Sequence, residues 1–170
     1  QGRMDNPLNQ TGQNQAKTLG SKLKDLNESF DVLGASPLVR ALETAKIVGS
    51  YLSMEVSFLD SNFVERDFGK FEGDSIDVAL EFITDDQFKE SSFEDNVKLQ
   101  ERIINATKEL YKTYMGKKVL FVAHSHVIKA LLIASDKNKY TYTNHFVGNS
   151  SIVYFKISED KIEVLKQIDL

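Results

Sequence analysis

The fold of this chain is decided by KKVLFVAHSH, residues 117–126. The stretch contains five consecutive apolar residues, Val119 to Ala123, and such a run is typical of a strand buried on both faces. It stops at His124, and apolar residues at helical spacing follow at once. A strand that passes directly into a helix indicates an α/β sheet, with His124 at the edge where the strand ends.

That edge is where ligands bind in open α/β sheets, and the first turn of a helix offers free N–H groups to an anion. A histidine placed there can hold a phosphate or transfer a proton near neutral pH. The alternative is a buried, hydrogen-bonded histidine with a structural role. His124 is therefore a candidate site residue.

The other elements follow from apolar spacing and turn residues. Helices are predicted from an N-cap at Thr11, after Pro37, and from Glu101 to Tyr114, and strands at Phe30 to Ala35, Val56 to Leu59, Ser151 to Ile157 and Ile162 to Ile168. Strands alternate with helices, which predicts a three-layer α/β fold with a mostly parallel sheet flanked by helices and an antiparallel C-terminal hairpin. Residues 1–170 are predicted to form a single domain, in which residues 75–94 are a lid-like excursion.

Composition narrows the class of protein. The chain has 170 residues, of which 41% are hydrophobic and 27% charged, as in ordinary globular proteins. The net charge of −4 does not suggest a partner such as nucleic acid or a membrane surface. There is no cysteine, which excludes disulfides and thiolate chemistry and fits a cytoplasmic protein. No apolar run approaches the roughly 20 residues that span a bilayer.

Two further segments carry candidate chemistry. Arg40 lies in the first turn of the helix after Pro37, at the same sheet edge as His124, where a guanidinium can hold a phosphoryl oxygen. The loop from residue 63 to residue 73 offers three acids, Glu65, Asp67 and Glu72, any of which near an anion pocket could act as a general acid. The residues alone do not choose among these three. For each residue the alternative is a solvated surface charge.

Five motifs then occur in order along the chain. They are Gly2-Arg3-Met4-Asp5-Asn6-Pro7-Leu8 with Gly12 and Gln15-Ala16; Ser36-Pro37-Leu38 with Arg40-Ala41 and Thr44-Ala45; Glu65, Asp67-Phe68-Gly69 and Glu72-Gly73; Val122-Ala123-His124-Ser125; and Asn149-Ser150-Ser151-Ile152. Together they resemble the histidine phosphatase (phosphoglycerate mutase-like) superfamily, in its small phosphatase branch.

The resemblance implies phosphoryl transfer from a small phosphorylated metabolite through a phosphohistidine, with no metal and no cofactor. Carried over by position, His124 is the second histidine, Arg40 the second arginine and Glu65 the proton donor. The backbone N–H of Ser125 and the turn at Gln1 and Gly2 are expected to contact the phosphate.

The chain departs from the family pattern in two places. Ser125 stands where the family usually has glycine, which adds a hydroxyl near the phosphate. The family's Arg-His-Gly strand, which carries the nucleophile, lies just upstream of the motif that begins at Gly2, so the nucleophile is expected upstream of Gln1. His126 and His145 do not take its place.

The phosphatase interpretation has two alternatives. A phosphoglycerate mutase is less favoured, because family mutases carry longer lid and C-terminal segments. A non-catalytic phosphate-binding module is the interpretation if the chain truly starts at Gln1. The acidic 75–94 segment argues against doubly anionic substrates. The sequence leaves the oligomeric state open, with a dimer among the options.

Overall fold

The computed structural model describes residues 1–85 and 87–170. Its helices are α1 (Gln10–Asp25), α2 (Val39–Leu52), α3 (Ile76–Thr84), α4 (Asn96–Thr113) and α5 (Ser125–Ser135). Its strands are β1 (Val32–Ala35), β2 (Phe58–Leu59), β3 (Val119–Val122), β4 (Ile152–Ile157) and β5 (Ile162–Ile168). Two short 3-10 turns, η1 (Ser61–Phe63) and η2 (Gly69–Phe71), lie in the loop after β2.

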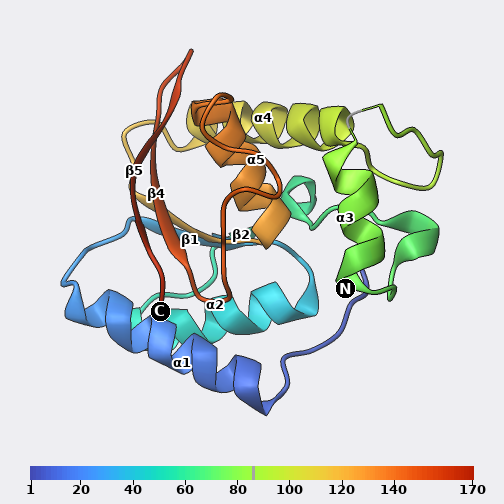
Figure 1. The fold of residues 1–170 in the computed structure, drawn as a ribbon. Coiled ribbons are helices and arrows are strands. Elements are labelled where there is room, and N and C mark those ends of the chain that lie inside the picture. The colour runs from blue at the N-terminus through green and yellow to red at the C-terminus, as the bar shows by residue number, and fades with distance from the viewer. Residues whose placement is uncertain (86) are drawn as a thin grey trace.

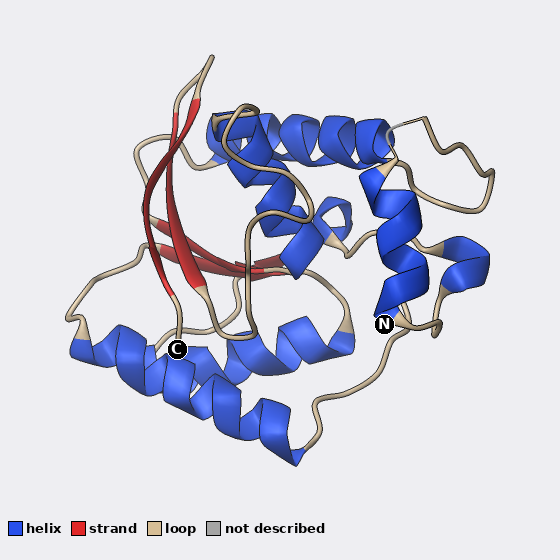
Figure 2. Ribbon diagram, in the orientation of Figure 1, coloured by secondary structure: helices blue, strands red, loops and turns tan. Residues whose placement is uncertain are grey.

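A parallel sheet with the strand order β2-β1-β3 forms the middle layer. In its register Ala35 lies opposite both Leu59 and Val122, so the carboxyl ends of all three strands meet at one edge. Helices α1 and α2 cover one side of the sheets, and α4 and α5 lie on the other (Figures 1 and 2). The predicted three-layer α/β fold is confirmed, and its parallel strands direct the site residues to a single edge.

The C-terminal hairpin differs in detail from the expectation. β4 and β5 pair antiparallel in a two-stranded sheet of their own instead of extending the parallel one. Leu120 of β3 nevertheless packs in the same apolar cluster as Ile152 and Tyr154 of β4. Within the part of the chain that the structure describes, β3 pairs with β1 alone.

This unpaired edge corrects the prediction that β3 is buried on both faces. All four of its residues, Val119 to Val122, are only partly buried. By contrast, Leu33 and Ala35 of β1, which has a neighbour on each side, are fully buried. The apolar run identified a strand correctly, but burial depends on neighbours that the run does not specify.

Helix boundaries differ from the predicted ones where a capping residue was overlooked. Helix α1 begins at Gln10, since Asn9 and not Thr11 is its N-cap, accepting a hydrogen bond from the Gly12 N–H at 2.8 Å. Helix α4 begins five residues before Glu101, because Asp95 accepts from the Lys98 N–H at 2.9 Å. Strands β1 and β2 are shorter than predicted, and residues 75–94 contain α3. Their behaviour as a lid stays a prediction.

Two apolar layers hold the sheet between its helices. On one side Leu23, Val48 and Leu33 are buried between α1, α2 and the sheet. On the other side α4 and α5 enclose a core that includes Leu99, Ile103, Val127 and the aromatic residues Phe63 and Phe93. None of the described helices is long and apolar enough to cross a membrane.

Candidate functional site

The ends of β1 and β3 bring Ser36 and His124 together. His124 is the N-cap of α5, and its Nε2 lies 2.8 Å from the hydroxyl of Ser36, which follows β1 directly. Ser36 is fully buried and His124 is 8% exposed. Ser36 was not among the predicted site residues. The signal that could have found it is its place at a strand end, equivalent to that of His124.

Burial, together with the charges of Arg40 and Arg102, lowers the pKa of His124 to about 3. The imidazole is therefore neutral near pH 7. A neutral imidazole offers one donor and one acceptor nitrogen, so the ring can orient a neighbouring group by hydrogen bonding.

Arg40 connects α2 to the N-terminal segment. Its Nη2 donates to the Gly2 carbonyl at 2.7 Å and its Nη1 donates to the Met4 carbonyl at 2.8 Å. Its charge interacts with the carboxylate of Glu65 as well as with the ring of His124. Arg40 is therefore close enough to Glu65 and His124, the other two residues predicted to be catalytic, for its charge to lower the pKa of each.

Glu65 reaches the same place from the loop after β2. Its Oε1 accepts from the Arg66 N–H at 2.8 Å, and its Oε2 accepts from the His126 N–H, in the first turn of α5, at 3.4 Å. Burial raises the pKa of Glu65, while these two N–H groups and the charges of Arg40 and Arg66 oppose the rise. A carboxyl group with a raised pKa is suited to general acid catalysis.

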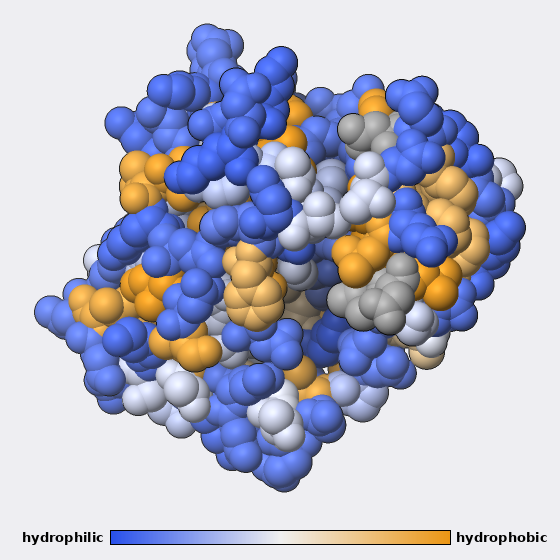
Figure 3. Space-filling model, viewed as in Figure 1, coloured by the Kyte–Doolittle hydropathy of each residue, from blue (hydrophilic) through white to orange (hydrophobic). Residues whose placement is uncertain are grey.

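The three residues predicted to be catalytic therefore converge at the carboxyl edge of the sheet. The face of the molecule that Figure 3 shows is hollowed near its centre, between the first turns of α2 and α5 as they lie in Figure 1. Ser125 is the first residue of α5, and its hydroxyl donates to the Val147 carbonyl at 3.3 Å. For the Ser125 N–H, no hydrogen bond is found among residues 1–85 and 87–170.

The N-terminal turn lies beside this site. Gly2 is buried with φ of +50°, and a Cβ there would clash with the Glu72 carboxylate and lie 2.8 Å from the Phe68 ring. The Gln1 carbonyl accepts from the Met4 N–H at 2.9 Å, and Gln1 itself is exposed. That Gln1 and Gly2 contact a phosphate stays a prediction.

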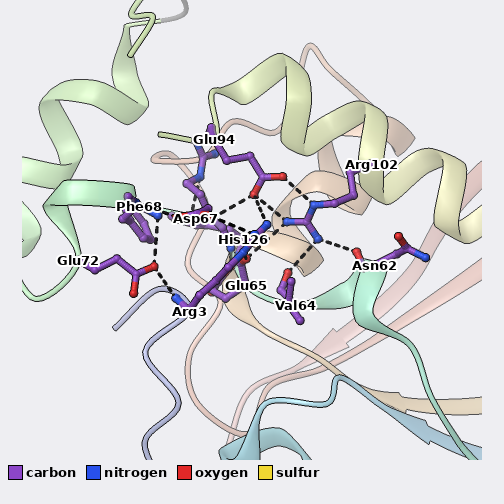
Figure 4. Close-up of polar contacts among 12 residues, drawn as sticks. Arg3, Asn62, Val64, Glu65, Asp67, Phe68, Glu72, Glu94, Arg102 and His126 are labelled. Carbon is purple, nitrogen blue, oxygen red and sulfur yellow. Dashed lines mark hydrogen bonds and ion pairs between the residues drawn. The ribbon is translucent and has the colours of Figure 1, made fainter. Parts of the chain in front are cut away.

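The other two acids of the loop have different partners. Asp67 forms an ion pair with Arg3 at 3.1 Å. Glu72 accepts from the backbone N–H groups of Arg3 at 2.7 Å and Phe68 at 3.4 Å (Figure 4). Of the three acids, only the Glu65 side chain accepts from the first turn of α5 within the described chain, which favours Glu65 over the other two as the acid.

Glu94 and Arg102, which were not among the predicted site residues, support the acidic loop. Arg102 of α4 donates from Nε and Nη2 to the two Glu94 carboxylate oxygens at 2.6 and 2.8 Å (Figure 4). Its Nη1 donates to the carbonyls of Asn62 and Val64 at 2.6 and 3.0 Å. Both residues lie among charged neighbours without a local motif, so nothing in the sequence distinguished them from surface charges.

The two remaining histidines have separate environments. The Nδ1 of His126 accepts from the Nε of Arg66 at 3.2 Å. His145 lies in the loop before β4, with its Nε2 at 2.8 Å from the Gln167 side-chain oxygen. That neither ring serves as the nucleophile stays a prediction.

Comparison with known proteins agrees with this architecture. A phosphatase of Bacillus subtilis (strain 168), the uncharacterized phosphatase PhoE, is 37% identical over 132 residues, which are 78% of this chain and only 66% of that protein. A phosphoserine phosphatase mutant from Entamoeba histolytica, solved with phosphoserine, superposes with a TM-score of 0.81 at 23% identity, over 98% of this chain and 86% of that one. A phosphoglycerate mutase from Bacillus anthracis gives a TM-score of 0.74 at 26% identity, over 97% and 83% of the two chains.

These structural similarities establish the fold, and the family follows from the sequence. The family model of the histidine phosphatase superfamily (branch 1) matches residues 1–169, which is nearly the whole chain. The chain therefore belongs to the histidine phosphatase superfamily, branch 1.

Proposed function

We propose that this protein is a phosphomonoesterase that hydrolyses small phosphorylated metabolites. The observation that carries the proposal is that Glu65 accepts from the first turn of α5, the helix that His124 caps, while the charge of Arg40 acts on both Glu65 and His124. A guanidinium, a carboxyl group with a raised pKa and an imidazole are the groups that phosphoryl transfer needs for binding and proton delivery. The similarity to a phosphatase of Bacillus subtilis supports this choice.

In the proposed reaction Arg40 and the Ser125 N–H bind the phosphoryl oxygens, and His124 donates a further hydrogen bond to them. A nucleophilic histidine forms a P–N bond as the ester P–O bond breaks, and Glu65 gives its proton to the leaving oxygen. Water then attacks the phosphorus, Glu65 accepts a proton from it, and the P–N bond breaks to release phosphate. No metal takes part in this scheme.

The nucleophile is proposed to lie on a strand that precedes Gln1, as in the family that this chain resembles. The free edge of β3 supports the proposal, because unpaired backbone groups in a sheet are costly unless water or another strand satisfies them. Leu120 of β3 already shares an apolar cluster with Ile152 of β4, although the two strands do not pair. A strand between β3 and β4 would join both sheets and bring its residues to the edge that holds His124.

The charges near Arg40 bear on the choice of substrate. Besides Glu65, the carboxylates of Asp5 and Glu72 interact with the Arg40 guanidinium. Three acids around one arginine disfavour a substrate with a second anionic group. We therefore expect monophosphates with a neutral or cationic remainder to be preferred, and a cytoplasmic location suits such metabolites.

The test is hydrolysis of p-nitrophenyl phosphate and glycerol 2-phosphate by the full-length protein. His124→Ala and Arg40→Ala should each lower kcat/KM roughly 100-fold or more, because each removes a group that stabilises the transferring phosphoryl group. Lys112→Ala is the control, since Lys112 is exposed and its ion pair is with the equally exposed Glu109. Phosphate bound without turnover would refute the enzyme, and isomerisation of phosphoglycerate without phosphate release would identify a mutase instead.

A further inference from the structure

Arg66 is an unusual core residue, because it is 0% exposed and no carboxylate among residues 1–85 and 87–170 pairs with it directly. Its Nη1 donates to the Glu94 backbone carbonyl at 3.1 Å. Its guanidinium carbon lies 4.5 Å from the centre of the Tyr142 ring and 5.5 Å from that of Phe93. Burying a charge in this way is costly, and an apolar side chain of similar volume often stabilises a core as well or better. Stability alone therefore gives little reason for an arginine here.

In the described part of the chain, His126 is the one residue whose side chain accepts a hydrogen bond from Arg66. The Arg66 Nε lies 3.2 Å from the His126 Nδ1, and this geometry requires Nδ1 to be the unprotonated nitrogen, with the proton on Nε2. The His126 ring is held between Phe68 and Tyr142, at centroid distances of 5.6 and 5.7 Å. The bond thus joins the loop after β2 to the first turn of α5 within an aromatic enclosure.

The backbone N–H groups of the same two residues bind the Glu65 carboxylate. The Arg66 N–H donates to one carboxylate oxygen and the His126 N–H donates to the other. Arg66 and His126, whose side chains are hydrogen-bonded to each other, therefore each bind Glu65 through a backbone N–H. A shift of either segment would move the carboxyl group relative to His124, which caps the same helix.

We propose that Arg66, acting through His126, is a positioning residue that holds the Glu65 carboxyl against the first turn of α5. This inference rests on the proposed function, in which Glu65 protonates the leaving oxygen. A general acid works only within hydrogen-bond reach of that oxygen, so a small displacement lowers the rate of the chemical step. The hydrogen bond between Arg66 and His126 thereby keeps Glu65, which lies in the loop after β2, in a fixed position relative to His124, the N-cap of α5.

The test compares two substrates that differ in their need for an acid. p-Nitrophenolate leaves readily without a proton, whereas the alkoxide of glycerol 2-phosphate does not. In the full-length enzyme, Arg66→Met and His126→Leu should lower kcat/KM for glycerol 2-phosphate roughly tenfold more than kcat/KM for p-nitrophenyl phosphate. His126→Asn should keep the ratio of the two within about threefold of wild type, because the Asn side-chain oxygen can accept the hydrogen bond in place of Nδ1. Lys112→Met, at an exposed position, serves as the control.

The possible outcomes distinguish a failure of this proposal from a failure of the proposed phosphatase mechanism. If Glu65→Gln leaves the substrate ratio unchanged, Glu65 is not the acid and the proposed mechanism fails first. If Glu65→Gln shifts the ratio while Arg66→Met and His126→Leu reduce both substrates equally, Arg66 is merely structural and the proposal is overturned. Equal ratios in the Leu and Asn variants at position 126 would also overturn it. Should Arg66→Met not fold, the matched pair at position 126 still decides.

Discussion

Replacing Glu94 by glutamine tests whether one buried ion pair holds the loop that carries Glu65. The Glu94 carboxylate accepts two hydrogen bonds from Arg102, one from the Asp67 N–H at 3.1 Å and an ion-pair contact from Arg3 at 3.4 Å. The Glu94 and Arg102 side chains are only 10% and 18% exposed. Removing one partner from a buried ion pair typically costs about 3–5 kcal/mol.

The expected loss is smaller here, about 2–3 kcal/mol in the free energy of unfolding, for two reasons. Glutamine keeps one acceptor oxygen, and Arg102 keeps its bonds to the Asn62 and Val64 carbonyls. Urea unfolding of Glu94→Gln and wild type at pH 7 measures the difference. The matched control is Glu109→Gln, whose 2.7 Å pair with Lys112 is 72% and 66% exposed and should contribute no more than about 0.5 kcal/mol.

The pH dependence gives an independent check on the same contact. Burial works to raise the pKa of Glu94, but Arg102, the Asp67 N–H and Arg3 outweigh it and hold the pKa below its ordinary value. A carboxylate whose pKa is lower in the folded state contributes stability above its unfolded pKa, about 4.3, and loses it as the pH falls through the folded value. The difference between wild type and Glu94→Gln should therefore be largest at pH 7 and shrink in acid. A loss under about 1 kcal/mol at pH 7, or one that stays constant into acid, would refute the reasoning.

Three further substitutions test other parts of the structure. Ser36→Ala leaves the buried Nε2 of His124 without its partner and should lower the free energy of unfolding by about 1–3 kcal/mol in urea, whereas an unchanged midpoint would mean that the 2.8 Å contact contributes nothing. Gly2→Ala forces a side chain into a backbone with φ of +50° and against Glu72, so thermal unfolding should show a loss of at least about 1–2 kcal/mol, and full stability would contradict the described turn. Ile103→Ala empties a fully buried position between α4 and α5 and should cost about 2–5 kcal/mol by chemical denaturation, with less than about 1 kcal/mol indicating a looser core.

The parts of the fold that were predictable are those with a local pattern. The apolar run before His124 identified β3, and alternating residues identified β4 and β5 to within one residue at their ends. The start of α4 was missed, because Asp95 caps a first turn whose residues Asn96 to Gln100 carry a weak apolar pattern. Burial of β3 was overestimated, since it depends on a second neighbouring strand.

The site residues, too, were predictable only where a local pattern marks them. His124 and Arg40 were predictable because each follows directly on a strand end, and parallel strands bring such ends to one edge. Glu65 was not separable from Asp67 and Glu72 by residue type or spacing, because all three lie in one loop. Its distinction is a contact with α5, sixty-one positions away in the chain.

Residue pattern and strand-to-helix order thus define the class of fold, the edge that carries the chemistry and the family, since each depends on neighbours along the chain. Contacts between distant segments define the rest: the hydrogen bond from Ser36 to His124, the support that Arg102 and Glu94 lend to the acidic loop, and the buried link between Arg66 and His126. The physical reason is that burial and pairing set the energy of a charged or titratable group, and both are properties of the packed molecule. An arginine in a polar loop and one enclosed by aromatic rings look alike until the chain is folded.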